Sequence, residues 1–236
     1  MGGGINLDRE LLLAPSLGCC NLFNMKEEIL FIDKHAHILH MDIKDGNYVK
    51  TFGIGPNFMN SIKDVVTKPM DAHLMVKHPQ DFIEACANAG ATYITPHTDC
   101  IESDAFVTLN KIKELGCKPG VALNPAASLE NIRYYLPLLD KVTIMIVDAG
   151  YSGQKPIKEM YDKIRTLVKW REEMKLDFLI EADGSMCGEI YGELYEAGVD
   201  VVVLGPPALW KLNKDFKKAW SMMKKEVENS IETYKK

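Results

Sequence analysis

Short apolar segments alternate with longer amphipathic segments eight times along this chain, and that repetition limits the folds available to it. Near-continuous apolar runs of this kind are typical of strands that are buried on both faces of a parallel sheet. Proline opens the amphipathic segment at 56–66 and glycine follows the one at 103–115, as at helix ends. We therefore expect strands at 11–17, 38–43, 69–74, 92–95, 118–123, 141–147, 177–182 and 200–204, and helices at 24–34, 56–66, 79–89, 103–115, 128–135, 156–174, 187–197 and from 213 onward.

Eight strand–helix units in 236 residues fit one α/β domain folded as a (β/α)8 TIM barrel. The alternative is a doubly wound open sheet of the dinucleotide-binding kind. That sheet requires G-x-G-x-x-G after its first strand, whereas this chain has Pro15-Ser16-Leu17-Gly18 there. We predict a single barrel domain over residues 1–236, with residues 1–8 as a flexible N-terminal extension.

Composition excludes several partners. The net charge is −5 and no basic block occurs, so a nucleic-acid partner is not expected. No apolar run reaches the roughly 20 residues of a membrane span, and charged residues at 8–10 precede the first apolar segment, unlike in a signal peptide. The six cysteines form no C-x-x-C pair and are interpreted as free thiols of a cytoplasmic protein.

Ionisable residues stand at the ends of three of the expected strands. His40, Asp42 and Lys44 alternate along one strand and therefore share a face, His73 lies near the end of the next, and Asp183 ends a later one. In any one strand, a buried hydrogen bond explains such residues as well as a site does. A closed barrel would gather them at its carboxyl-terminal rim. Two imidazoles and two carboxylates would suit a divalent zinc, manganese or iron ion.

Glycine-rich turns follow the last three expected strands, at 150–153, at Gly184-Ser185 and at Gly205. Loops in this part of a barrel often bind a phosphate through backbone N–H groups. Tight strand-to-helix turns are the alternative explanation for the glycines.

Together these motifs resemble those of the ribulose-phosphate 3-epimerase family, along nearly the whole chain. The matching stretches are Pro15-Ser16-Leu17, His40-Met41-Asp42-Ile43-Lys44-Asp45-Gly46, His73-Leu74-Met75-Val76, Leu123-Asn124-Pro125, Gly150-Tyr151-Ser152-Gly153-Gln154 and Glu181-Ala182-Asp183-Gly184. The branch of D-allulose-6-phosphate 3-epimerases is similar in Tyr134-Tyr135, Asp140-Lys141-Val142-Thr143, Trp170-Arg171-Glu172 and Ser185.

The resemblance implies a metal-dependent isomerase that epimerises a ketose phosphate at C3. The substrate pair would be D-ribulose 5-phosphate and D-xylulose 5-phosphate, or D-allulose 6-phosphate and D-fructose 6-phosphate. His40, Asp42, His73 and Asp183 would hold one divalent metal per subunit of a homo-oligomer. Asp42 and Asp183 would be the acid/base pair of a 1,1-proton transfer through an enediolate. The implied substrate-binding residues are Ser16, His73, Met75, Met145, Gly150, Tyr151, Ser152, Gly153, Gly184, Ser185 and Gly205.

Some positions depart from the family pattern. The family usually has Met where this chain has Lys44, Pro at Ala149, and Ser or Thr at Pro206, where proline removes one N–H donor. Lys44, an additional candidate site residue, could weaken metal binding or pair with Asp45 or an anionic substrate.

Two other functions remain open. A decarboxylase or aldolase of the related phosphate-binding barrels would carry Asp-x-Lys-x-x-Asp on the second strand. Asp42 and Lys44 begin that pattern, but Asn47 replaces its second Asp. A barrel that binds a sugar phosphate without turnover is the non-enzymatic alternative.

Overall fold

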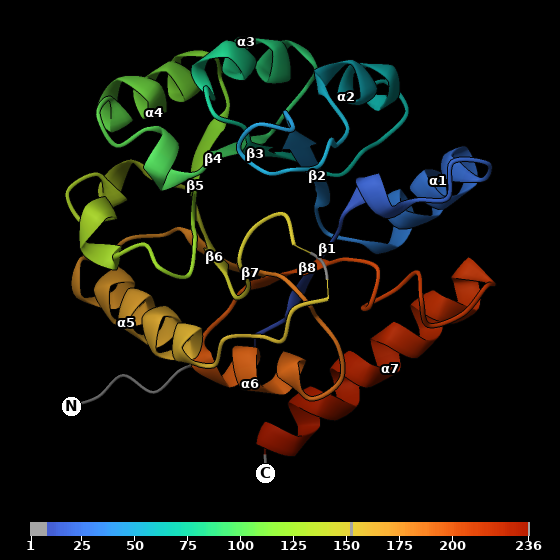
Figure 1. Cartoon of the computed structure of the whole chain (residues 1–236). Coiled ribbons are helices and arrows are strands. Elements are labelled where there is room, and N and C mark those ends of the chain that lie inside the picture. Colours follow the sequence, from blue (N-terminus) through green and yellow to red (C-terminus); the bar gives the residue numbers. More distant parts are fainter. Residues whose placement is uncertain (1–8, 152, 236) are drawn as a thin grey trace.

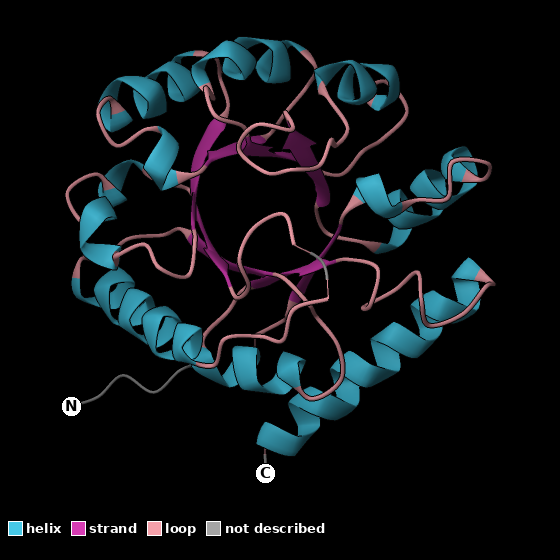
Figure 2. Ribbon diagram, viewed as in Figure 1, coloured by secondary structure: helices cyan, strands magenta, loops and turns pink. Residues whose placement is uncertain are grey.

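The computed structural model describes residues 9–151 and 153–235 (Figure 1). Its strands are β1 (Leu12–Pro15), β2 (Leu39–Lys44), β3 (Met70–Met75), β4 (Tyr93–Pro96), β5 (Lys118–Leu123), β6 (Lys141–Met145), β7 (Leu179–Asp183) and β8 (Val201–Leu204). They pair in parallel in the order β1-β8-β7-β6-β5-β4-β3-β2. A parallel bridge between Ser16 and His40 brings β1 against β2. The predicted barrel is therefore confirmed, with helices around a nearly closed ring of strands (Figure 2).

The helices are α1 (Met25–His35), α2 (Pro56–Ile62), α3 (Gln80–Asn88), α4 (Ala105–Glu114), α5 (Glu159–Glu173), α6 (Ile190–Ala197) and α7 (Phe216–Tyr234). Short 3-10 helices η1 (Leu17–Cys19) and η2 (Thr98–Cys100) follow β1 and β4. Within the described ranges, no helix combines the length and the apolarity needed to cross a bilayer. The predicted extension at 1–8 lies outside the described residues.

One predicted helix was wrong. The segment at 128–135 forms the 3-10 helix η3 (Leu129–Ile132), and a second one, η4 (Leu136–Leu138), follows it. Ser128 begins η3 by accepting the backbone N–H of Glu130. Pro137 prevents an α-helix from continuing, and the segment left before it is too short for a stable one. Another predicted boundary also moved: α7 begins at 216 rather than 213, because Asp215 caps it by accepting two backbone N–H groups.

The barrel interior holds a small apolar cluster, which consists of Ala14, Ile38, Val201 and Val203, with Leu12 and Leu179 packed against them. Buried charged residues, among them Asp71, Lys141 and Glu181, share the interior with this cluster. The main hydrophobic core fills the space between strands and helices instead, and includes Leu39, Met41 and Ile43 of β2. Alternation along β2 therefore leaves His40, Asp42 and Lys44 facing the interior.

The carboxylate of Asp33 connects α1 to the loop before β3 through three hydrogen bonds. Asp33 accepts the backbone N–H groups of Thr67 (2.7 Å) and Lys68 (2.9 Å) and the Thr67 hydroxyl (3.0 Å). Burial opposes ionisation, but these hydrogen bonds outweigh it and lower the pKa of Asp33. A lowered folded-state pKa stabilises the fold above the unfolded value of about 3.9, and this contribution disappears as the pH falls.

We therefore expect Asp33→Asn to reduce the free energy of unfolding at pH 7 by about 1–3 kcal/mol. The difference from the parent should shrink below about pH 4. Urea unfolding at both pH values measures it. Asp64→Asn, which changes an exposed carboxylate nearby, should stay within about 0.5 kcal/mol of the parent. A pH-independent loss would show that the ionised carboxylate is not responsible.

Candidate active site

Closure of the barrel brings four ionisable side chains of β2, β3 and β7 together inside it. Atom Oδ1 of Asp42 lies 3.3 Å from His40 Nε2 and 3.4 Å from His73 Nδ1. Atom Oδ2 of Asp183 lies 3.5 Å from His73 Nδ1 and 4.0 Å from His40 Nε2. The two imidazole nitrogens are 3.3 Å apart. Residues separated by more than 140 positions in the sequence thus converge on one point.

These four side chains fit a divalent metal ion. Four ligand atoms arranged tetrahedrally about 2.0–2.1 Å from one ion would lie roughly 3.3–3.4 Å apart, close to most of the observed separations. The outer ring nitrogens are also engaged, as is usual for metal-binding histidines. His40 Nδ1 lies 2.8 Å from Asp71 Oδ2, and His73 Nε2 lies 2.9 Å from His97 Nε2. With the outer nitrogens carrying the hydrogens, both lone pairs face the cluster.

The electrostatics of the cluster also favour a cation. Burial opposes the imidazolium form, but the hydrogen bonds to Asp42 and Asp71 outweigh it and raise the pKa of His40 well above its usual range. Burial likewise opposes the Asp42 carboxylate, yet hydrogen bonds from His40 and His73 hold its pKa well below the usual value. Burial raises the pKa of Asp183, and the charge of Asp42 adds to that effect against the opposing charge of His40. The carboxylates of this buried cluster thus attract positive charge, which a divalent cation would supply.

A cavity of about 420 Å³ opens above the cluster at the rim of the barrel. Its walls include Asp42, Asp183 and many of the residues that the family resemblance implied. These are Ser16, Met75, Met145, Gly150, Tyr151, Gly153, Gly184, Ser185 and Gly205, together with Lys44. His40 and His73 are fully buried. Ser152, also among the implied residues, lies outside the described ranges.

The glycine after Asp183 is required by the geometry of the turn. Gly184 has a φ of 121°, in the region that favours glycine, and a Cβ there would lie 2.5 Å from Val147 Cγ2. Ser185 follows with a φ of 45°, and its hydroxyl donates to the Gln154 carbonyl. The turn after β7 thus keeps its backbone close to the loop after β6, on one side of the cavity.

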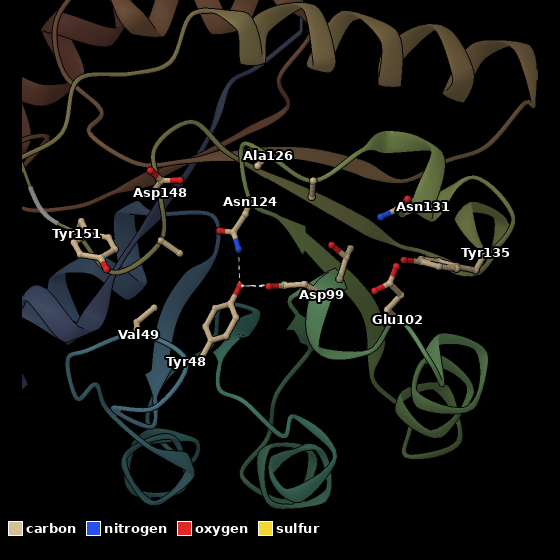
Figure 3. Close-up of a pocket in the computed structure, with 13 residues that line it drawn as sticks. Tyr48, Val49, Asp99, Glu102, Asn124, Ala126, Asn131, Tyr135, Asp148 and Tyr151 are labelled. Carbon is tan, nitrogen blue, oxygen red and sulfur yellow. Dashed lines mark hydrogen bonds between the residues drawn. The ribbon is translucent and has the colours of Figure 1, made fainter.

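A larger cavity, of about 640 Å³, lies beside the first and shares Asp148, Ala149 and Tyr151 with it. Figure 3 shows Tyr48 pointing toward Asn124 and Asp99 on its wall, and the Tyr48 hydroxyl bonds to both side chains. None of the four cluster residues lines this space. The smaller cavity, by contrast, is lined by two of them, Asp42 and Asp183.

A buried polar network supports the cluster from below, and sequence reasoning missed it. Lys141 Nζ donates to Asp71 Oδ2 (2.5 Å) and to Glu181 Oε1 (2.7 Å), and all three side chains are inaccessible to solvent. The hydroxyls of Thr95 and Thr143 donate to the two carboxylates. Asp71 in turn orients His40. Asp71 lies two residues before His73 and Glu181 two before Asp183, so strand alternation could have indicated both.

His97, the residue directly after β4, also supports the cluster. In the structure it is fully buried, and its ring stacks on that of His73 with the centroids 5.0 Å apart. Burial, together with the charge of His73, lowers the pKa of His97 well below its usual range. A neutral His97 can accept a hydrogen bond from His73, which orients that imidazole toward the cluster.

Comparison with known proteins identifies relatives over most of the chain. The sequence profile described as the Ribulose-phosphate 3 epimerase family matches residues 12–209. A ribulose-phosphate 3-epimerase of Aquifex aeolicus is 38% identical over 197 residues, covering 82% of this chain and 87% of the relative. One from Synechocystis is 35% identical over 201 residues, covering 84% and 87%, and one from Escherichia coli K12 is 33% identical over 221 residues, covering 93% and 97%.

Solved structures show the same fold at low sequence identity. The crystal structure of KGPDC from Streptococcus mutans has a TM-score of 0.67 and 13% identity, covering 93% of this chain and 98% of that one. The 3-hexulose-6-phosphate synthase from Salmonella typhimurium has a TM-score of 0.67 and 17% identity, covering 95% and 100%. These similarities support the barrel fold and carry no information on the reaction.

Proposed function

Because this chain belongs to the ribulose-phosphate 3-epimerase family and is thus an isomerase of the epimerase class, we propose that it inverts C3 of a phosphorylated ketose with the help of one divalent metal ion. The observation that carries the proposal is the convergence of Asp42, Asp183 and two imidazoles at the floor of one cavity. Zinc, manganese and iron all suit this set of nitrogen and oxygen ligands.

A ketose proton at C3 is too weakly acidic for an unaided carboxylate. The metal ion, when bound by the four side chains, supplies a Lewis acid that stabilises the negative charge of the enediolate. One of Asp42 and Asp183 removes the proton from C3, and the other returns a proton to the opposite face. The Ser16 hydroxyl donates to Asp42 Oδ2 at 2.8 Å and so orients that carboxylate. Buried Met75 and Met145 give the cavity an apolar wall that limits access of water.

The phosphate end of the substrate is assigned to the loops after β6, β7 and β8. Gly150, Gly153, Gly184, Ser185 and Gly205 line this side of the cavity, and backbone N–H groups of such turns suit a phosphate. Pro206 provides no N–H, but Lys211, which follows it in the same loop, also lines the cavity and carries a positive charge.

The other functions considered from the sequence fit less well. A decarboxylase of the Asp-x-Lys-x-x-Asp type needs a second acid at position 47, and Asn47 is both exposed and absent from the cavity wall. A barrel that merely binds sugar phosphates has no need for two carboxylates gathered with two imidazoles. We extend the proposal to a cytoplasmic homo-oligomer: the cysteines, none of them paired, suit a reducing compartment.

Deuterium exchange tests the proposal and chooses the substrate. Metal-loaded protein in deuterated water should introduce deuterium at C3 of D-ribulose 5-phosphate or D-allulose 6-phosphate, and protein stripped by a chelator should not. The ketose that exchanges its C3 hydrogen faster shows whether the substrate is a five-carbon or a six-carbon sugar phosphate. Absence of exchange with both ketoses in fully metal-loaded protein would contradict the epimerase proposal.

A further inference from the structure

Lys44 places a positive charge beside one of the proposed acid/base groups. It is the last residue of β2 and lines the 420 Å³ cavity. Its Nζ lies 4.0 Å from Asp42 Oδ2, and its side chain is 23% exposed. Because Oδ1 of Asp42 faces the imidazoles while Oδ2 faces Ser16 and Lys44, the ammonium stands outside the cluster, on its cavity side.

No neighbouring carboxylate neutralises this charge in place of Asp42. Asp45, the nearest acid in the sequence, uses its carboxylate to accept the backbone N–H groups of Asn47, Tyr48 and Lys77, each at 2.8 Å. In the described part of the chain, Asp42 is the only acid within 4.0 Å of the Lys44 ammonium. The ammonium is therefore available to an anionic group that enters the cavity.

The loop after β2 packs against the aliphatic part of the Lys44 side chain. Gly53 packs so closely on the end of β2 that a Cβ there would lie 2.2 Å from the Asp42 carbonyl oxygen and 3.1 Å from Lys44 Cγ. The preceding residues, Thr51 and Phe52, line the cavity. Glycine at 53 thus lets the loop cover the aliphatic part of Lys44 while the ammonium still reaches the cavity.

We propose that Lys44 is a further catalytic residue, whose ammonium binds the oxyanion that develops on the ketose during proton transfer. This inference rests on the proposed epimerase function. When the C3–H bond breaks, the proton passes to one carboxylate and the electron pair delocalises onto the carbonyl oxygen. The other carboxyl group then donates a proton to the opposite face of C3, and the ketone is restored. The negative charge exists only between these two transfers, so a cation there lowers the barrier more than it strengthens substrate binding.

Lys44→Met removes the charge and keeps the length of the side chain. With saturating metal, kcat for C3 exchange should fall about 10²-fold, with KM changed less than about threefold. Lys44→Arg, which keeps the charge, should recover most of the loss. Lys77→Met is the matched control, because Lys77 is exposed just after β3 and does not line the cavity.

Two ligands separate stabilisation of the intermediate from ordinary binding. A phosphorylated four-carbon hydroxamate has an ionisable, planar head like the enediolate, whereas xylitol 5-phosphate is uncharged apart from its phosphate. By calorimetry on metal-loaded protein, Lys44→Met should lose about 10²-fold in affinity for the hydroxamate and less than threefold for the polyol phosphate. This readout does not depend on turnover.

The outcomes distinguish this inference from the proposed function. If the parent protein exchanges deuterium and Lys44→Met keeps its kcat within threefold, Lys44 is not catalytic and the epimerase proposal stands. Equal losses for both ligands would likewise overturn the inference, since they would indicate ground-state binding of the phosphate. If the parent protein shows no exchange with either ketose, that result contradicts both the proposed epimerase function and the catalytic role of Lys44.

Discussion

Asp183→Asn is expected to lower C3 deuterium exchange by about 10³-fold or more, the largest effect on activity that we expect from one substitution. Asparagine has nearly the same shape as aspartate, but it cannot take up or return the proton. It also supplies a weaker ligand to the metal, so some loss of metal affinity should accompany the loss of exchange. Exchange is followed by NMR on protein whose metal content has been measured.

The control for this substitution is an aspartate on the amino-terminal side of β7, the strand that Asp183 ends. Asp177 is exposed two residues before β7 begins, and Asp177→Asn should keep exchange within about twofold of the parent. If Asp183→Asn turns over substrate at a rate near that of the parent while still binding metal, Asp183 cannot be one of the two acid/base groups.

Lys141→Met is expected to have the largest effect on stability. It should lower the free energy of unfolding at pH 7 by about 3–5 kcal/mol. Its ammonium is the charged partner of both Asp71 and Glu181 inside the barrel, where none of the three side chains touches solvent. Burial opposes the charge, but the two carboxylates outweigh it and raise the pKa of Lys141. Removing the ammonium leaves two buried acids without their cation.

Urea unfolding measures this effect. Lys118→Met serves as the control, because Lys118 also opens a strand, β5, but is exposed there; its variant should stay within about 0.5 kcal/mol of the parent. A change below about 1 kcal/mol for Lys141→Met would mean that the carboxylates are protonated or hydrated, and the ion-pair account of the interior would be wrong.

The barrel could be predicted from the sequence because its signal is local. Apolar strands with helix start and stop residues repeat at even spacing, and the wrongly predicted helix at 128–135 lies just before a proline at 137 whose effect was not weighed. The ionisable residues at strand ends were also visible, since His40 and Asp42 alternate on one strand. Barrel closure alone then brings His73 and Asp183 to the same rim.

The supporting residues could not be predicted in the same way. Lys141 begins an apolar strand and resembles an exposed strand end, yet it bonds across the barrel to Asp71, a partner 70 residues away on a strand that is not its neighbour. No periodicity encodes such a contact, which depends on the diameter of the barrel. Whether Lys44 pairs with Asp45 was equally hidden, because one of the backbone N–H groups that occupy the Asp45 carboxylate comes from Lys77, in a distant turn.

The proposed function requires that His40, Asp42, His73 and Asp183 bind a single divalent cation. Anomalous diffraction from crystals soaked with zinc tests it most directly. We predict one anomalous peak per chain, about 2.0–2.2 Å from an imidazole nitrogen of each histidine and a carboxylate oxygen of each aspartate. A peak elsewhere, or none between these four side chains at saturating zinc, would contradict the account.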